Sequence, residues 1–186
     1  MINFDKKQAL IQLLNSKSVR FGTFTLASGK TSDFYVDARQ CTLNAQGALL
    51  IADLIINVLK PEIVAVGGPV TGADPIAGAV ALRSTLLGRE IHGFMVRKEP
   101  KGHGGKQWVE GLKNIPEGSP ICVVEDTVTT GGSLLRAAEK LEDAGLKVAQ
   151  CITVVDRQEG ARKKIEESGY EYTALVTREE LFKARQ

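Results

Sequence analysis

The segment from Ile121 to Ser133, ICVVEDTVTTGGS, constrains the fold of this 186-residue chain more than any other. Its first four residues are apolar and indicate a buried strand, which ends in two adjacent carboxylates, Glu125 and Asp126. A loop of threonines and glycines follows, and apolar residues at three-four spacing up to Ala144 then predict a helix. Open α/β sheets bind ligands at the carboxyl ends of their strands, so this unit predicts a ligand site there.

The composition of the loop indicates the ligand. Gly131 and Gly132 let backbone N–H groups approach an anion, and the amino end of the next helix favours a phosphate. Glu125 and Asp126 would repel that phosphate, so they need a separate partner, such as a vicinal diol or a ligand that carries Mg²⁺. A phosphate joined to a diol describes a ribose 5-phosphate. The alternative is an acidic pair on a solvated strand end, followed by an ordinary glycine turn.

Strands and helices alternate through the rest of the chain. We predict strands at 63–66, 91–96, 148–155 and 172–176, and helices at 5–18, 44–59, 76–86, 161–168 and 177–186. This alternation predicts an α/β fold, with a mostly parallel central sheet flanked by helices on both faces. Residues 21–37 read as two strands across a turn. We expect one domain over residues 1–186, with a small amino-terminal hood at approximately 1–40.

Composition argues against several classes of function. The net charge of +2 and the lack of a Lys/Arg run argue against a nucleic-acid partner, and no apolar stretch is long enough for a membrane span. The start of the chain, MINFDKKQAL, lacks an apolar secretory core, so we expect a cytoplasmic protein. Three widely spaced cysteines and two isolated histidines argue against a disulfide framework and a zinc site.

Two further segments follow predicted strands. GGPVTGAD, at 67–74, is a second strand–glycine loop–helix unit that can cradle a pyrophosphate through backbone N–H groups. Residues 97–111 contain four cations and His103 among four glycines and a proline. This segment is either a solvated surface loop or a lid that closes over a pyrophosphate.

These motifs resemble those of a known family. VVEDTVTTGGS is similar to the phosphoribosyl pyrophosphate (PRPP) signature of type I phosphoribosyltransferases. FTLASGKTSDFYVD resembles the hood of the orotate phosphoribosyltransferases, and RKEPKGHG resembles their mobile catalytic loop, at approximately 97–111. The resemblance covers nearly the whole chain and implies the type I phosphoribosyltransferase fold.

The resemblance implies a reaction and its partners. The enzyme would transfer the 5-phosphoribosyl group of PRPP to orotate, giving orotidine 5′-monophosphate and pyrophosphate in pyrimidine (UMP) biosynthesis. Mg²⁺ would be held mainly through PRPP, near Glu125 and Asp126, without direct protein ligands. The protein would form a homodimer in which each catalytic loop reaches the neighbour's site.

The resemblance also implies residue roles. Lys101, His103 and Asp126 would be catalytic. Residues that would contact PRPP are Arg97, Lys98, Lys101, His103, Glu125, Asp126, Thr127, Val128, Thr129, Thr130, Gly131, Gly132 and Ser133. The pyrophosphate loop would comprise Gly68, Pro69, Val70, Thr71 and Gly72, and orotate would contact Phe34, Tyr35, Thr129 and Arg157, with Lys30 as a further candidate.

Some positions depart from the family or allow another role. Ala27 and Thr71 stand where related enzymes carry lysine, and Lys30 is a candidate substitute for the first. Arg157, at the end of a predicted strand, can pair with a substrate carboxylate in a two-pronged bond, or with a neighbouring acid on the surface. Trp108 either packs on the lid or covers the surface.

Two other functions are weighed against this one. A phosphoribosyltransferase for a purine or uracil is disfavoured by the hood motif and by Arg157, because a neutral base offers an arginine no carboxylate. A PRPP-sensing regulator that binds nucleic acid is disfavoured by the chain length and the small net charge.

Overall fold

The computed structural model describes residues 4–25, 31–101 and 107–185. Its helices are α1 (Phe4–Lys17), α2 (Arg39–Thr42), α3 (Ala45–Val58), α4 (Asp74–Leu86), the 3₁₀ turn η1 (Leu112–Asn114), α5 (Gly132–Asp143), α6 (Ala161–Glu167) and α7 (Arg178–Lys183). Its strands are β1 (Val19–Thr25), β2 (Thr31–Val36), β3 (Ala65–Pro69), β4 (His92–Lys101), β5 (Gln107–Glu110), β6 (Pro120–Val128), β7 (Lys147–Asp156) and β8 (Tyr172–Thr177). Among these helices, none is long and apolar enough to cross a membrane.

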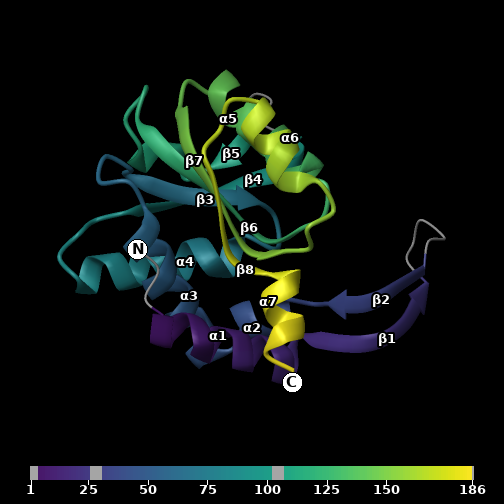
Figure 1. The fold of residues 1–186 in the computed structure, drawn as a ribbon. Helices are drawn as coiled ribbons and strands as arrows, with labels where there is room; N and C mark the ends of the chain where they lie inside the picture. The colour runs from purple at the N-terminus through teal and green to yellow at the C-terminus, as the bar shows by residue number, and fades with distance from the viewer. Residues whose placement is uncertain (1–3, 26–30, 102–106, 186) are drawn as a thin grey trace.

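The central sheet has six strands in the order β5-β4-β3-β6-β7-β8. Strands β4, β3, β6, β7 and β8 pair in parallel, and β5 pairs antiparallel with β4. Figure 1 shows helices on both sides of this sheet and the β1–β2 ribbon projecting from one side. The predicted α/β fold with a mostly parallel sheet is therefore confirmed.

The alternation of side chains along β6 divides the core in two. Ile121 and Val123 pack in a cluster with residues of α5 and α6, whereas Cys122 and Val124 pack in a cluster with residues of α1, α3 and α4. Successive strand residues point to opposite faces of a sheet, so the uninterrupted apolar run of β6 is explained by burial on both faces.

The connections diverge between β3 and β6. From β3 the chain passes through α4 to β4, and from β6 it passes through α5 to β7 on the other side. Helices α4 and α5 belong to different core clusters, so they cover opposite faces of the sheet. In a doubly wound sheet, the carboxyl ends of two such strands border a crevice where ligands bind.

The predicted pair of hood strands is present as the antiparallel ribbon of β1 and β2. Phe21 of β1 and Phe34 of β2 lie against Phe182 of α7, with ring centroids 4.9 and 5.7 Å away. Helix α7 therefore supports the ribbon through this aromatic contact. Ala27 and Lys30, in the predicted turn, lie outside the described residues.

The predicted loop at 97–111 has a different structure. Strand β4 continues to Lys101, and residues from Gln107 form β5, which pairs with β4 as an antiparallel strand. Val96 and Val109 are partners in this pairing and both are buried, so apolar burial anchors the hairpin. His103 lies outside the described residues.

Candidate active site

Two loops flank the place between β3 and β6 where the connections diverge. The loop after β3 carries Thr71 and Gly72, and the peptide bond between Val70 and Thr71 is cis. Thr129 and Thr130 lie in the loop after β6, and Gly131 caps α5 with a φ of 76°. A side chain at Gly131 would be strained by this φ and would press on Ile165. The free N–H groups at the start of α5 can bind an anion such as a phosphate.

The two carboxylates do not end the strand as the sequence suggested, because β6 continues to Val128 and pairs with β7 as far as Asp156. Val128 is buried in the core, so its side chain is not available to a ligand. Glu125 and Asp126 are consecutive strand residues and point to opposite faces of the sheet. A ligand that contacts both carboxylates must therefore sit over the end of β6.

The surroundings of the two acids differ. Ser133, in the first turn of α5, forms a hydrogen bond with Glu125, whose charge also interacts with Arg136. On the other face, Asp126 accepts the N–H of Thr127 at 2.8 Å and interacts electrostatically with Arg39. Burial raises the pKa of Glu125 to about 7 and also raises the pKa of Asp126. Both acids thus lie where a cation or hydroxyl donors would stabilise their charged forms.

Cations gather on the α5 side of the crevice. A pocket of about 300 Å³ is lined by Pro69, Val70, Val96, Arg97, Lys98, Ser133, Arg136, Ala137 and Lys140. Arg97 pairs with Glu110 at 3.2 Å, and Lys140 donates to the carbonyl of Arg97 at 3.3 Å. This pocket adjoins both loops, and its charge suits a polyanion. Lys101 follows Lys98 by three residues at the end of β4, and its side chain lies outside the described part of the chain.

Trp108 has a structural role within this arrangement. The Lys140 ammonium lies over the Trp108 ring, 3.6 Å from its centroid, in a cation–π interaction. The ring is partly buried against the cluster that contains α5. Trp108 therefore joins β5 to α5 beside the cationic pocket.

The aromatic pair in the hood is divided between the two faces of β2. Phe34 is only 1% exposed and packs in the core, so the expectation that both rings face a flat ligand does not fit the structure. Tyr35, its neighbour on the opposite face, is 41% exposed and lies against Phe24. Alternation along the strand explains the division, and it leaves Tyr35 as the ring that a ligand can reach.

Arg157 lies between the hood and the end of β6. Its backbone N–H donates to the carbonyl of Val128 at 3.0 Å, and its guanidinium is 6.0 Å from the centroid of the Phe34 ring. One terminal nitrogen pairs with Glu159 at 2.9 Å. Its Nε is buried and has no hydrogen-bond partner in the part of the chain that the structure describes. A buried donor of this kind favours a ligand that accepts a hydrogen bond.

A second pocket, of about 240 Å³, lies between the hood and the loop after β3. It is lined by Tyr35, Val36, Asp37, Ala38, Arg39, Thr71, Gly72, Asp126 and Thr127. Sequence reasoning did not identify Asp37 and Arg39 here, nor Arg136 and Lys140 in the cationic pocket. The charged pair directly after the hood strand was a signal for the first two.

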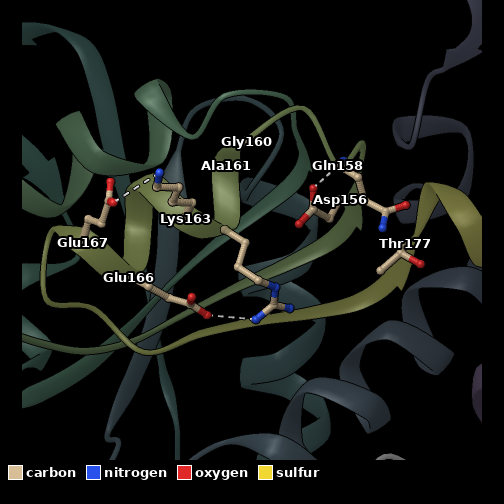
Figure 2. Close-up of a pocket in the computed structure, with 9 residues that line it drawn as sticks. Asp156, Gln158, Gly160, Ala161, Lys163, Glu166, Glu167 and Thr177 are labelled. Carbon is tan, nitrogen blue, oxygen red and sulfur yellow. Dashed lines mark hydrogen bonds and ion pairs between the residues drawn. The ribbon is translucent and has the colours of Figure 1, made fainter.

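A larger groove, of about 610 Å³, lies beside α6 and the end of β8. Figure 2 shows Lys163 directed toward Glu167, and the side chain of Gln158 beside Thr177. The two cations of the groove, Arg162 and Lys163, each pair with a glutamate one helical turn away, at 2.9 and 3.7 Å. These charges are already compensated locally, so the groove suits a phosphorylated ligand less well than the crevice does.

Comparison with known proteins identifies relatives over nearly the whole chain. Residues 41–174 match the phosphoribosyl transferase domain. The chain is 44% identical over 156 residues to the orotate phosphoribosyltransferase of Thermosynechococcus vestitus. This alignment covers 84% of this chain and 82% of that protein. It is 41% identical over 175 residues to the Sorangium cellulosum enzyme of the same name, with 93% and 91% covered.

A solved structure shares the fold. The Mycobacterium tuberculosis orotate phosphoribosyltransferase, crystallised in complex with PRPP, aligns with a TM-score of 0.79 at 34% sequence identity. The alignment covers 95% of this chain and 99% of that one.

The burial of Glu125 predicts a change of stability with pH. Its pKa is about 7 in the folded protein and ordinarily 4.5, so the unfolded chain loses this proton first. The fold consequently loses stability as the pH rises from 4.5 through 7. Glu125→Gln removes that loss and should raise the free energy of unfolding by roughly 2 kcal/mol more at pH 8 than at pH 5.5. Denaturant unfolding at the two pH values measures this difference.

Glu139→Gln, on the exposed side of α5, controls for the loss of one acid at the surface. An equal effect of Glu125→Gln at both pH values would contradict the burial of Glu125 as a neutral acid.

Proposed function

Because this chain belongs to the orotate phosphoribosyltransferase family of phosphoribosyl transferase enzymes, we propose that it transfers the 5-phosphoribosyl group of PRPP to orotate with Mg²⁺. The bond between ribose C1 and the pyrophosphate oxygen breaks, a bond forms between C1 and a ring nitrogen of orotate, and the proton of that nitrogen is released. The products are orotidine 5′-monophosphate and pyrophosphate, and the reaction belongs to UMP biosynthesis.

The observation that carries the proposal is the meeting of two anion-binding loops at the divergence of β3 and β6. We infer that the 5-phosphate binds at Thr129–Ser133, at the amino end of α5, and that Glu125 and Asp126 receive the ribose hydroxyls between the loops. The pyrophosphate then lies along Gly68–Gly72. One ligand with a phosphate at each end of a ribose accounts for all three features.

The neighbouring residues fit the metal. Asp126 and Glu125 supply oxygen donors, which Mg²⁺ prefers, and the raised pKa of each acid means that a nearby cation would stabilise its charged form. When bound together with PRPP, Mg²⁺ would neutralise charge on the leaving pyrophosphate. We propose that it is held mainly through PRPP, beside these two acids.

The chain's own cations address the rest of the charge that develops. We propose that Arg97 and Lys98, which line the cationic pocket, bind the pyrophosphate. Lys101 and His103 are proposed to close on the same group, with His103 donating a hydrogen bond or proton to the leaving oxygen. Asp126 would stabilise the positive charge that builds at the ribose. The side chains of Lys101 and His103 lie outside the described residues.

Orotate is assigned to the space between the hood and Arg157. Its carboxylate would take over the pairing that Arg157 now makes with Glu159, and would also satisfy the buried Nε. Tyr35 would pack on the ring, while Phe34 supports Arg157 from the core. We propose Thr129 and Lys30 as further contacts of orotate.

An apolar surface supports the proposed homodimer. Leu49 of α3 and Leu82 and Leu86 of α4 are each at least half exposed, around an apolar hollow of about 190 Å³. Surfaces of this kind commonly bind a partner, and a second copy of the chain is the proposed occupant.

The cysteines support a cytoplasmic location. Cys41, Cys122 and Cys151 are all buried and free. A reducing compartment maintains thiols in this state. We therefore propose that the enzyme works in the cytoplasm.

Orotate consumption, followed by its ultraviolet absorbance with PRPP and Mg²⁺, tests the function, with hypoxanthine and uracil as control bases. We expect turnover of orotate alone. Arg157→Gln should raise KM for orotate roughly 10- to 100-fold and leave KM for PRPP nearly unchanged, because a two-pronged charged contact is lost. Glu159→Gln, which removes the competing acid, should leave KM for orotate unchanged or lower. Turnover of another base, or an effect of Arg157→Gln on PRPP alone, would contradict the assignment.

Mixing two impaired variants tests the shared loop, when activity is assayed at an orotate concentration too low for the Arg157→Gln site to turn over. If Lys101 acts in the partner's site and Arg157 in its own, a heterodimer of Lys101→Ala and Arg157→Gln subunits contains one intact site. Subunit exchange should then restore about a quarter of the unaltered activity, since half of the dimers are mixed. Mixtures that stay inactive, although mass spectrometry shows heterodimers, would place both residues in the same subunit's site.

A further inference from the structure

The pocket between the hood and the loop after β3 contains a cation without an assigned role. Its lining combines the residues after β2 with Thr71, Gly72 and Asp126. Among the described residues that line it, Arg39 carries the one positive charge, whereas Asp37 and Asp126 are acidic. An anion that enters this pocket would meet two carboxylates, and Arg39 is the group placed to offset them.

The guanidinium of Arg39 is held in place but remains accessible. Its Nε donates to Oδ1 of Asp37 at 3.0 Å, and Gln40 donates to Oδ2 of the same carboxylate at 3.3 Å. The Arg39 side chain is 53% exposed. An arginine bonded through Nε still presents its two terminal nitrogens, and a planar pair of donors suits phosphate oxygens.

Electrostatics link Arg39 to the reacting end of the crevice. The pKa of Arg39 is raised by its hydrogen bond and charge interaction with Asp37, and further by Asp126. Asp126 also lies against the backbone of Gly72, because a Cβ there would come within 2.5 Å of its Oδ1. Arg39, Asp126 and Gly72 therefore border one small space.

The loop after β3 has no charge of its own. The five residues from Gly68 at the end of β3 to Gly72 are GPVTG, and Thr71 offers a hydroxyl but no charge. A pyrophosphate held only by backbone N–H groups beside Asp126 would be poorly compensated on this side. The cations of the other pocket lie on the α5 side, next to Pro69 and Val70.

We propose that Arg39 binds the pyrophosphate group of PRPP and supplies, beside Thr71 and Gly72, the positive charge that the pyrophosphate loop lacks. The inference rests on the proposed function, since it takes PRPP as the ligand. Pyrophosphate is favoured over orotate because Arg39 shares its pocket with the loop after β3, whereas orotate is assigned to Arg157.

The test compares Arg39→Gln, Arg39→Lys and Asp37→Asn with Arg162→Gln, a control that removes one charge from α6. Isothermal titration with inorganic pyrophosphate and Mg²⁺ gives Kd, and steady-state kinetics give KM for each substrate. Arg39→Gln should weaken pyrophosphate binding and raise KM for PRPP about tenfold, as expected for a lost charged hydrogen bond. KM for orotate should stay within about twofold, and Arg39→Lys should have an intermediate effect.

The outcomes separate the possible roles of Arg39. An unchanged pyrophosphate Kd in Arg39→Gln, or a rise in KM for orotate alone, would overturn the inference. An equal loss in Asp37→Asn, which keeps the guanidinium, would assign the effect to the ion pair and also overturn it. The proposed function fails separately: unaltered protein that binds pyrophosphate but consumes no orotate would refute the reaction and leave the Arg39 result standing.

Discussion

The close approach of β3 to its neighbours determines how the candidate site is arranged. A Cβ on Gly67 would collide with the carbonyl oxygen of Phe94 in β4, and one on Gly68 would collide with that of Val124 in β6. Glycine therefore allows three strands to meet where the chain turns toward opposite faces. Because α4 and α5 leave on different sides, neither helix covers the ends of β3 and β6, and the two loops face a common crevice.

Charge divides this crevice into two sides. Arg97, Lys98 and the two cations of α5 surround the exit of β3 on one side, whereas the hood side carries two acids and one arginine. Glu125 lies within β6, three residues before its end at Val128, and its burial raises its pKa to about 7. A buried carboxyl group with a raised pKa makes the fold less stable in the absence of a ligand, and such groups are common in functional sites. PRPP, with phosphates at both ends of a diol-bearing ring, matches this distribution of charge.

The sequence predicted the elements whose signals are local, and it was less informative about contacts between distant segments. The apolar run before Glu125 and the three-four spacing after Ser133 located β6 and α5, although β6 continues to Val128, two residues past its predicted end. The strand pairing at Gln107–Glu110 depends on burial of Val109 under α5, which no local pattern records. The alternation of side chains along β2 already implied that Phe34 and Tyr35 point to opposite faces. Both were nevertheless interpreted as ligand contacts because they resemble a known motif. The proximity of Arg39 to Asp126 arises only from folding, since 87 positions separate them.

We propose that the two loops at the divergence of β3 and β6 bind opposite ends of one substrate. Amide chemical shifts of the ¹⁵N-labelled protein test it most directly, with ribose 5-phosphate and pyrophosphate added separately in the presence of Mg²⁺. We expect ribose 5-phosphate to shift the amides of Thr129–Ser133, and pyrophosphate to shift those of Gly68, Thr71 and Gly72. Shifts of the same amides by both ligands, or shifts confined to Ala161–Glu167 beside the groove of Figure 2, would contradict it.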